Sequence, residues 1–211
     1  MSNWARRLEE DLRWREGELA SIKVSVLAAD QGSVRQLALL RAMWTLLYAH
    51  YEGFCKYAWE LYLEELGRLG LTRNDFIVPL ARFSLEKGFR ELRGDTSSES
   101  MWSFCSEGFN RMMNSPLEFG VELETESNLW PDLLKRNLGQ IGLACGTIDE
   151  HYQKIRALVA RRNDIAHGER MVIATVAEYQ TYYDAAMLVM HELAVAVVDS
   201  LDKGTYSVSQ K

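Results

Sequence analysis

Two side chains that could take part in chemistry stand close together near the end of a helical pattern, at Arg162 and His167. They open and close the run Arg-Asn-Asp-Ile-Ala-His, which is followed by Gly168. An arginine keeps its charge and presents a planar set of hydrogen-bond donors, and a histidine takes up or releases a proton near neutral pH. The spacing therefore marks a candidate site. A charged complement to the end of a helix dipole is the plainer interpretation, and the residues alone leave both open.

Positive charges gather just before and at the start of this run. The nine residues from 154 to 162 include four basic residues and no acidic one: Lys154, Arg156, Arg161 and Arg162. The whole chain has 24 basic and 30 acidic residues and a formal net charge of -6, so the cluster stands out. Arg162 also falls near the apolar side of its helix. We expect its guanidinium to lie against a neighbouring helix or a protein partner.

The sequence holds no motif for a metal or a cofactor. Its four histidines and three cysteines form no HExxH motif, no CxxC pair and no other spacing typical of a metal site. It also lacks a glycine-rich phosphate loop and a GxSxG motif. We therefore predict no metal, no cofactor and, from three widely spaced cysteines, no disulfide framework.

The elements that must position these residues are helical, because apolar residues recur every three or four positions along most of the chain. The clearest stripe runs for about seven turns, from Leu37 to Leu61. Further helical patterns cover residues 3–29, 131–142, 147–159 and 175–197, and the last two open with Thr-x-x-Glu capping signatures. The sequence predicts an all-α fold, an antiparallel helical bundle of four to five long helices.

A less regular stretch interrupts this pattern at about residues 71–128. We interpret it as an insertion of uncertain structure within a single helical domain that covers residues 1–211. Its last part alternates Phe119, Val121 and Leu123 with polar residues or glycine, which would also fit a short extended piece. The sequence does not indicate what this insertion does.

Composition limits the class of protein. With 47% hydrophobic residues among 211, the chain can build a full-sized core and is not disordered. Its net negative charge argues against binding nucleic acid through bulk charge, although a local basic patch is compatible with that total. The acidic N-terminal stretch is unlike a signal peptide, and no apolar run reaches the roughly 18 residues that a membrane span needs. We expect a soluble, cytoplasmic protein without a membrane partner.

The run from Arg162 to His167 fits the R-x4-6-H signature of the HEPN superfamily, and the residues around it resemble the prokaryotic branch of MAE-type HEPN-like nucleases. Two further stretches are similar to that branch: residues 50–62, within the long apolar stripe, and residues 126–143, before the motif helix. The resemblance covers residues 35–200, and the part from 71 to 120 matches poorly.

This resemblance implies an all-helical bundle, in agreement with the periodicity. Many members of the superfamily are metal-independent endoribonucleases of toxin–antitoxin or antiphage systems, and their active site forms where two protomers meet. By resemblance, the protein would be a homodimer that cleaves RNA by attack of the 2'-OH and leaves a 2',3'-cyclic phosphate. An antitoxin or another defence-system protein would be its partner.

The resemblance also implies roles for single residues. His167 would transfer protons, Arg162 would bind phosphate, and Asn163 would orient the 2'-OH or the phosphate. Asp164 would hold the imidazole or simply cap the helix, and Glu52 is either a supporting residue near the motif or an exposed helix glutamate. The remaining basic residues of the cluster would bind RNA: Lys154, Arg156 and Arg161.

Two other hypotheses compete with a ribonuclease. One is a non-catalytic HEPN-like module that dimerises and binds RNA or nucleotide within a larger defence assembly. The other is a general helical adaptor without nucleic-acid contact. The presence of both Arg162 and His167 favours the ribonuclease over the first, and the basic cluster would be unexplained by the second.

Overall fold

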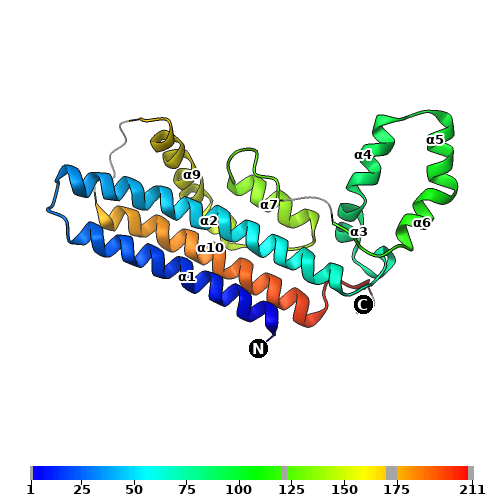
Figure 1. Cartoon of the computed structure of the whole chain (residues 1–211), viewed down its shortest axis with the longest axis horizontal. Coiled ribbons are helices and arrows are strands. Elements are labelled where there is room, and N and C mark those ends of the chain that lie inside the picture. Colours follow the sequence, from blue (N-terminus) through cyan, green and yellow to red (C-terminus); the bar gives the residue numbers. More distant parts are fainter. Residues whose placement is uncertain (1, 120–122, 170–174, 209–211) are drawn as a thin grey trace.

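The computed structural model describes residues 2–119, 123–169 and 175–208. Over these residues the secondary structure is helical, with two isolated bridges and no strand (Figure 1). The predicted all-α fold is confirmed. The described part of the chain contains no helix of the length and apolar character needed to cross a membrane.

Three long helices lie side by side and form the body of the molecule (Figure 1): α1 (Asn3–Leu27), α2 (Val34–Arg68) and α10 (Val176–Lys203). Helix α1 is antiparallel to the other two, and its Trp4 donates a hydrogen bond to Asp202 at the end of α10 (2.9 Å). Helices α2 and α10 run in the same direction, because both are antiparallel to α1. The bundle is therefore not antiparallel throughout.

Helix α2 lies at the centre of the core. From Leu40 onward, the predicted stripe to Leu61 is buried on α2, with Leu37 half-buried at its start. Ser33 caps the N-terminus by accepting a hydrogen bond from the backbone of Gln36 (3.1 Å). A helix of this length is stabilised mainly by such burial, because its side chains contact neighbouring helices on several sides.

Helix α9 (Tyr152–Ala166) packs against α2 and α10, on the side away from α1 (Figure 1). Its inner side chains are fully buried: Ile155, Leu158 and Val159. The indole nitrogen of Trp44, in α2, donates to the backbone oxygen of Leu158 (3.1 Å). These contacts fix the helix that carries the run from Arg162 onward.

One of the two predicted capping boxes is wrong. Thr147 does not cap a long helix but is the first residue of the one-turn helix α8 (Thr147–Glu150), which His151 separates from α9. Its N-terminus is capped from another helix, because the Glu192 carboxylate accepts from the backbone nitrogens of Gly146 (2.9 Å) and Thr147 (2.6 Å). At α10 the predicted N-cap is present, since the Thr175 hydroxyl accepts a hydrogen bond from the backbone nitrogen of Glu178 (3.0 Å).

Short helices make up the region predicted as an irregular insertion. They are η1 (Arg73–Asp75), α3 (Val78–Ser84), α4 (Glu86–Gly94), α5 (Ser98–Ser103), a π-helical turn (Phe104–Gly108), α6 (Phe109–Met113) and, after it, α7 (Pro131–Gln140). Figure 1 shows α4, α5 and α6 as an arm at one end of the bundle. The extended piece proposed around Phe119 falls partly on residues 120–122, outside the described residues.

Arg73 pins the base of this arm. Its guanidinium donates to the Ser84 hydroxyl (2.9 Å), to the Ser115 hydroxyl (2.6 Å) and to the backbone oxygen of Pro116 (2.9 Å). No residue of α5, the π-helical turn or α6 is buried. The arm is therefore held at its root rather than by a core of its own.

Candidate active site at the end of helix α9

Helix α9 ends in a tightly bonded turn around His167. Gly168 adopts a left-handed conformation (φ 80°), and its backbone nitrogen donates to Ile165 (3.1 Å). The next backbone nitrogen, of Glu169, donates to Asp164 (2.9 Å). This pair of bonds is the Schellman arrangement, which glycine makes accessible because it lacks a Cβ atom. His167 is the residue at the C-cap, and its side chain is exposed to solvent.

Arg162 points away from solvent, toward α2. Its guanidinium carbon lies 4.1 Å from the centre of the Tyr48 ring. One of its terminal nitrogens, Nη1, donates to the side-chain oxygen of Asn163 (2.9 Å). Arg162 and Asn163 are both half-buried. A guanidinium stacked on an aromatic ring keeps the donors at its edge available for a further ligand.

Tyr48 was not among the predicted site residues. It is 2% exposed, its hydroxyl donates to the Glu52 carboxylate, and it accepts a hydrogen bond from the backbone of Leu129 (2.9 Å). Burial, followed by the hydrogen bond to Glu52, raises the pKa of Tyr48 far above its usual range. The phenol therefore stays neutral and continues to donate. The spacing of Tyr48 and Glu52, four apart in one helix, is the only signal in the sequence that links them.

Glu52 lies behind this tyrosine. Its carboxylate also pairs with Lys56 of the same helix (2.8 Å), and its side chain is 18% exposed. It is thus connected to Arg162 through the Tyr48 ring, rather than by an ion pair with the guanidinium. This arrangement fits the supporting role considered for Glu52 better than the role of an exposed helix glutamate.

The basic cluster divides into two kinds of residue. Lys154 and Arg156 are exposed. Arg161 instead pairs with Glu178 (2.5 Å) and stacks against the rings of Trp44 and Tyr182, with its guanidinium carbon 5.1 and 5.2 Å from their centres. The placement of Arg161 does not support the prediction that it binds RNA, because its charge is already matched. That prediction stands for Lys154 and Arg156.

Among the described residues of one chain, Arg162 and His167 share no hydrogen-bond or ion-pair partner. Five residues correspond to about 140° around a helix, so the two side chains leave α9 on different sides. Asp164 is exposed, and no described residue hydrogen-bonds to its carboxylate or to the His167 imidazole. The role of Asp164 in holding the imidazole therefore has no support within a single described chain.

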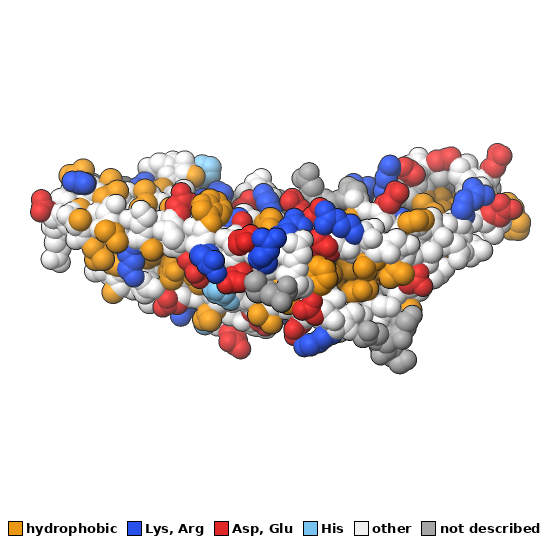
Figure 2. Space-filling model, turned by 60° about the horizontal axis from the view of Figure 1, so that its bottom comes forward, with side chains coloured by type: hydrophobic (Ala, Val, Ile, Leu, Met, Phe, Trp, Pro, Cys, Tyr) orange, Lys and Arg blue, Asp and Glu red, His pale blue; other side chains and the backbone are white. Residues whose placement is uncertain are grey.

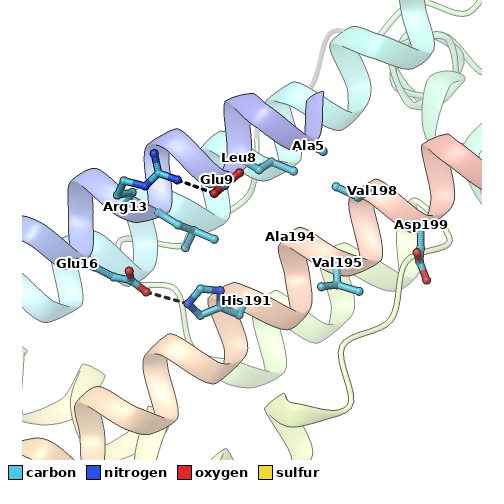
Figure 3. Close-up of a pocket in the computed structure, with 11 residues that line it drawn as sticks. Ala5, Leu8, Glu9, Arg13, Glu16, His191, Ala194, Val195, Val198 and Asp199 are labelled. Carbon is cyan, nitrogen blue, oxygen red and sulfur yellow. Dashed lines mark hydrogen bonds and ion pairs between the residues drawn. The ribbon is translucent and has the colours of Figure 1, made fainter. Parts of the chain in front are cut away.

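A groove of about 510 Å³ lies elsewhere, between α1 and α10 (Figure 3). Its floor is apolar, and two ion pairs cross or border it: Glu16 with His191 (2.9 Å) and Glu9 with Arg13 (2.5 Å). With the α1 side of the molecule brought forward, Figure 2 shows acidic and basic side chains interspersed with hydrophobic ones. Among the described residues, no three histidine, cysteine or acidic side chains are grouped as metal ligands.

Comparison with known proteins identifies the family. A family model described as MAE_28990-like HEPN matches residues 4–206. No curated protein and no solved structure matches the chain. The family match spans nearly all of the sequence, including α9 with its Arg162 and His167 and the arm that the motif resemblance covered poorly. The chain belongs to the MAE_28990-like HEPN family.

Proposed function

We propose that this HEPN protein is a metal-independent endoribonuclease of a toxin–antitoxin or antiphage defence system. The family is one whose members are often ribonucleases, which supports the reaction class. The observation that carries the proposal is the pairing, on one helix end, of a half-buried, stacked Arg162 with an exposed His167. The first is suited to holding a phosphate, and the second to exchanging protons with solvent or substrate.

In the proposed reaction, the 2'-oxygen of RNA attacks the adjacent phosphorus and gives its proton to one histidine. The bond from phosphorus to the 5'-oxygen breaks, and that oxygen receives a proton from a second histidine. Arg162 donates hydrogen bonds to the non-bridging oxygens, whose negative charge grows in the transition state. The products are a 2',3'-cyclic phosphate and a free 5'-hydroxyl, with no metal in any step.

A second copy of the chain would complete this site. One chain carries one His167, and its Arg162 leaves the helix on another side, so a base and an acid require two protomers. The solvent face of α2 supports close approach, because over about three turns it presents small uncharged side chains: Ala38, Ala42, Thr45 and Ala49. Both motifs of such a homodimer would face one cleft.

The test is incubation of the purified protein with total RNA, with and without EDTA, beside a His167→Ala variant. We expect cleavage in both buffers and none with the variant. Activity that disappears on chelation and returns with magnesium would contradict the proposal, as would equal cleavage by the variant.

The non-catalytic module has one observation in its favour: no described group of the same chain orients the His167 imidazole. Such a module would bind labelled RNA and retain it uncut. The same incubation separates the two functions, provided that RNA binding is measured in parallel, for example by a gel-shift assay.

A further inference from the structure

Tyr48 is the aromatic residue on which Arg162 stacks. Its distance of 4.1 Å to the guanidinium carbon is shorter than that of the other arginine–aromatic contacts described, which range from 4.9 to 6.0 Å. The ring comes from the centre of the bundle, where Tyr48 is buried within α2. The position of Arg162 is therefore set by a rigid helix and not only by its own rotamer.

The ring itself is held at its hydroxyl from two directions. Glu52 accepts from the hydroxyl, and the backbone nitrogen of Leu129 donates to it (2.9 Å). These three contacts, one to the ring face and two to the hydroxyl oxygen, hold the Tyr48 side chain in its position. A guanidinium resting on it is correspondingly restrained.

Leu129 follows a strained turn. Glu126 and Ser127 both adopt left-handed backbone conformations (φ 45° and 73°), which residues other than glycine, asparagine and aspartate rarely do. The turn closes with a hydrogen bond from the backbone of Asn128 to Thr125 (2.6 Å). Strain of this kind persists only where the surroundings hold it.

Helix α7 supplies that hold. Arg136 pairs with the Glu126 carboxylate (2.9 Å), and the buried side chain of Asn137 donates to the backbone oxygen of Glu124 (2.8 Å). The turn is fixed on one flank by α7 and on the other by the Tyr48 hydroxyl. The segment after the turn and helix α9 thus contact the same tyrosine: Leu129 bonds to the Tyr48 hydroxyl, and Arg162 stacks on its ring.

We propose that Tyr48 is the positioning residue for Arg162: its ring fixes the guanidinium so that the free donors face the substrate phosphate. This role rests on the proposed ribonuclease function. A guanidinium that swings freely would still attract RNA by charge, but it would reach the transition-state geometry less often. Loss of the ring should therefore lower kcat more than it raises KM.

The kinetic test compares three variants. Tyr48→Leu removes the ring, and we expect kcat to fall by roughly tenfold to a hundredfold with little change in KM. Tyr48→Phe keeps the ring and removes only the hydroxyl, so its kcat should stay within roughly fivefold of the parent. Tyr62→Phe is the matched control, since Tyr62 is a buried tyrosine of the same helix whose hydroxyl bonds to Ser200 (2.9 Å) away from the motif. Its kcat should not change.

A second readout does not depend on activity. Protons over the face of an aromatic ring resonate upfield, so the Arg162 Nε–H signal of the full protein should be shifted upfield and identified by its loss in Arg162→Lys. Tyr48→Leu should move it toward the positions of exposed arginines, and Tyr62→Phe should leave it in place.

The outcomes separate the positioning role from the proposed function. An Arg162 signal without the upfield shift in the folded parent would overturn the positioning role, even if Tyr48→Leu fails to fold. A kcat for Tyr62→Phe as low as that of Tyr48→Leu would also overturn it, because the effect would be one of general packing. If the parent cuts no RNA at all, the ribonuclease proposal fails, and the Arg162 signal still shows whether Tyr48 holds the guanidinium.

Discussion

Arg161 and Glu178 form an ion pair of 2.5 Å that joins the C-terminal half of the motif helix to the first turn of α10. The pair spans the connection between the two helices, and it lies beside Trp44 and Tyr182, on which the same guanidinium stacks. Its neighbour Arg162 turns to a different ring and has no carboxylate partner among the described residues. Two adjacent arginines therefore have different tasks, one in holding the fold and one at the candidate site.

Arg161→Ala should lower the free energy of unfolding by about 1 kcal/mol, from the loss of a half-buried ion pair and of the stacking. Denaturant unfolding measures this change. The matched variants Lys154→Ala and Arg156→Ala remove exposed charges of the same cluster, and they should unfold like the parent but bind RNA with a weaker salt dependence. Equal loss of stability in all three would contradict the division of the cluster.

Arg162→Lys should reduce RNA cleavage nearly as much as Arg162→Ala, by roughly a hundredfold. Lysine keeps the charge but has neither the planar pair of donors for phosphate nor the flat surface that stacks on Tyr48. Initial rates on a single RNA substrate provide the measurement. A lysine variant with most of the parent's activity would show that Arg162 acts only as a diffuse positive charge.

Mixing Arg162→Ala with His167→Ala should restore part of the activity when the two inactive proteins exchange subunits. In a mixed dimer, one arginine and one histidine remain. In a shared cleft they can bind the phosphate and take the 2'-proton, while water protonates the leaving 5'-oxygen in place of the second histidine, so the activity returns only in part. Each variant alone, treated in the same way, is the control. A protein that is monomeric by light scattering at micromolar concentration and cuts RNA at full specific activity would refute the shared cleft.

Glu192→Gln should destabilise the protein at pH 7 and lose this effect in acid. Burial alone would raise the pKa of Glu192, but hydrogen bonds from Thr147, Cys145 and Gly146 outweigh it and hold the pKa below its usual value. A carboxyl whose pKa is lower when folded stabilises the protein above the unfolded pKa, and the stabilisation is lost as the pH falls through the folded pKa. Unfolding of Glu192→Gln and parent at pH 7 and pH 3 tests this, with the exposed Glu150→Gln as control.

Much of the fold could be predicted because burial leaves a periodic trace in the sequence. The stripe from Leu40 to Leu61 and the start of α10 at Thr175 are examples. The predictions that depended on partners distant in the sequence fared less well. Glu192, not Thr147, provides the cap of α8, and no local pattern reports a carboxylate reaching across from another helix.

The candidate site divides in the same way. The order of Arg162, Asn163 and His167 along one helix is a local property, so the sequence reveals it. The sequence does not reveal that Arg161 stacks on Trp44 or that Arg162 stacks on Tyr48. Both contacts depend on how α9 crosses α2. Helical periodicity gives the buried side of each helix but not the residue that it meets.

The arm has a consequence for how such a protein can change over generations. Since no side chain between Ser98 and Met113 is buried, substitutions there should alter stability little. The clamp at Arg73 holds the root of the arm whatever its tip displays. Mutation and selection can therefore reshape the surface that the arm offers while the helices around Arg162 and His167 stay as they are. The surface of the arm and the helices of the candidate site are free to evolve separately.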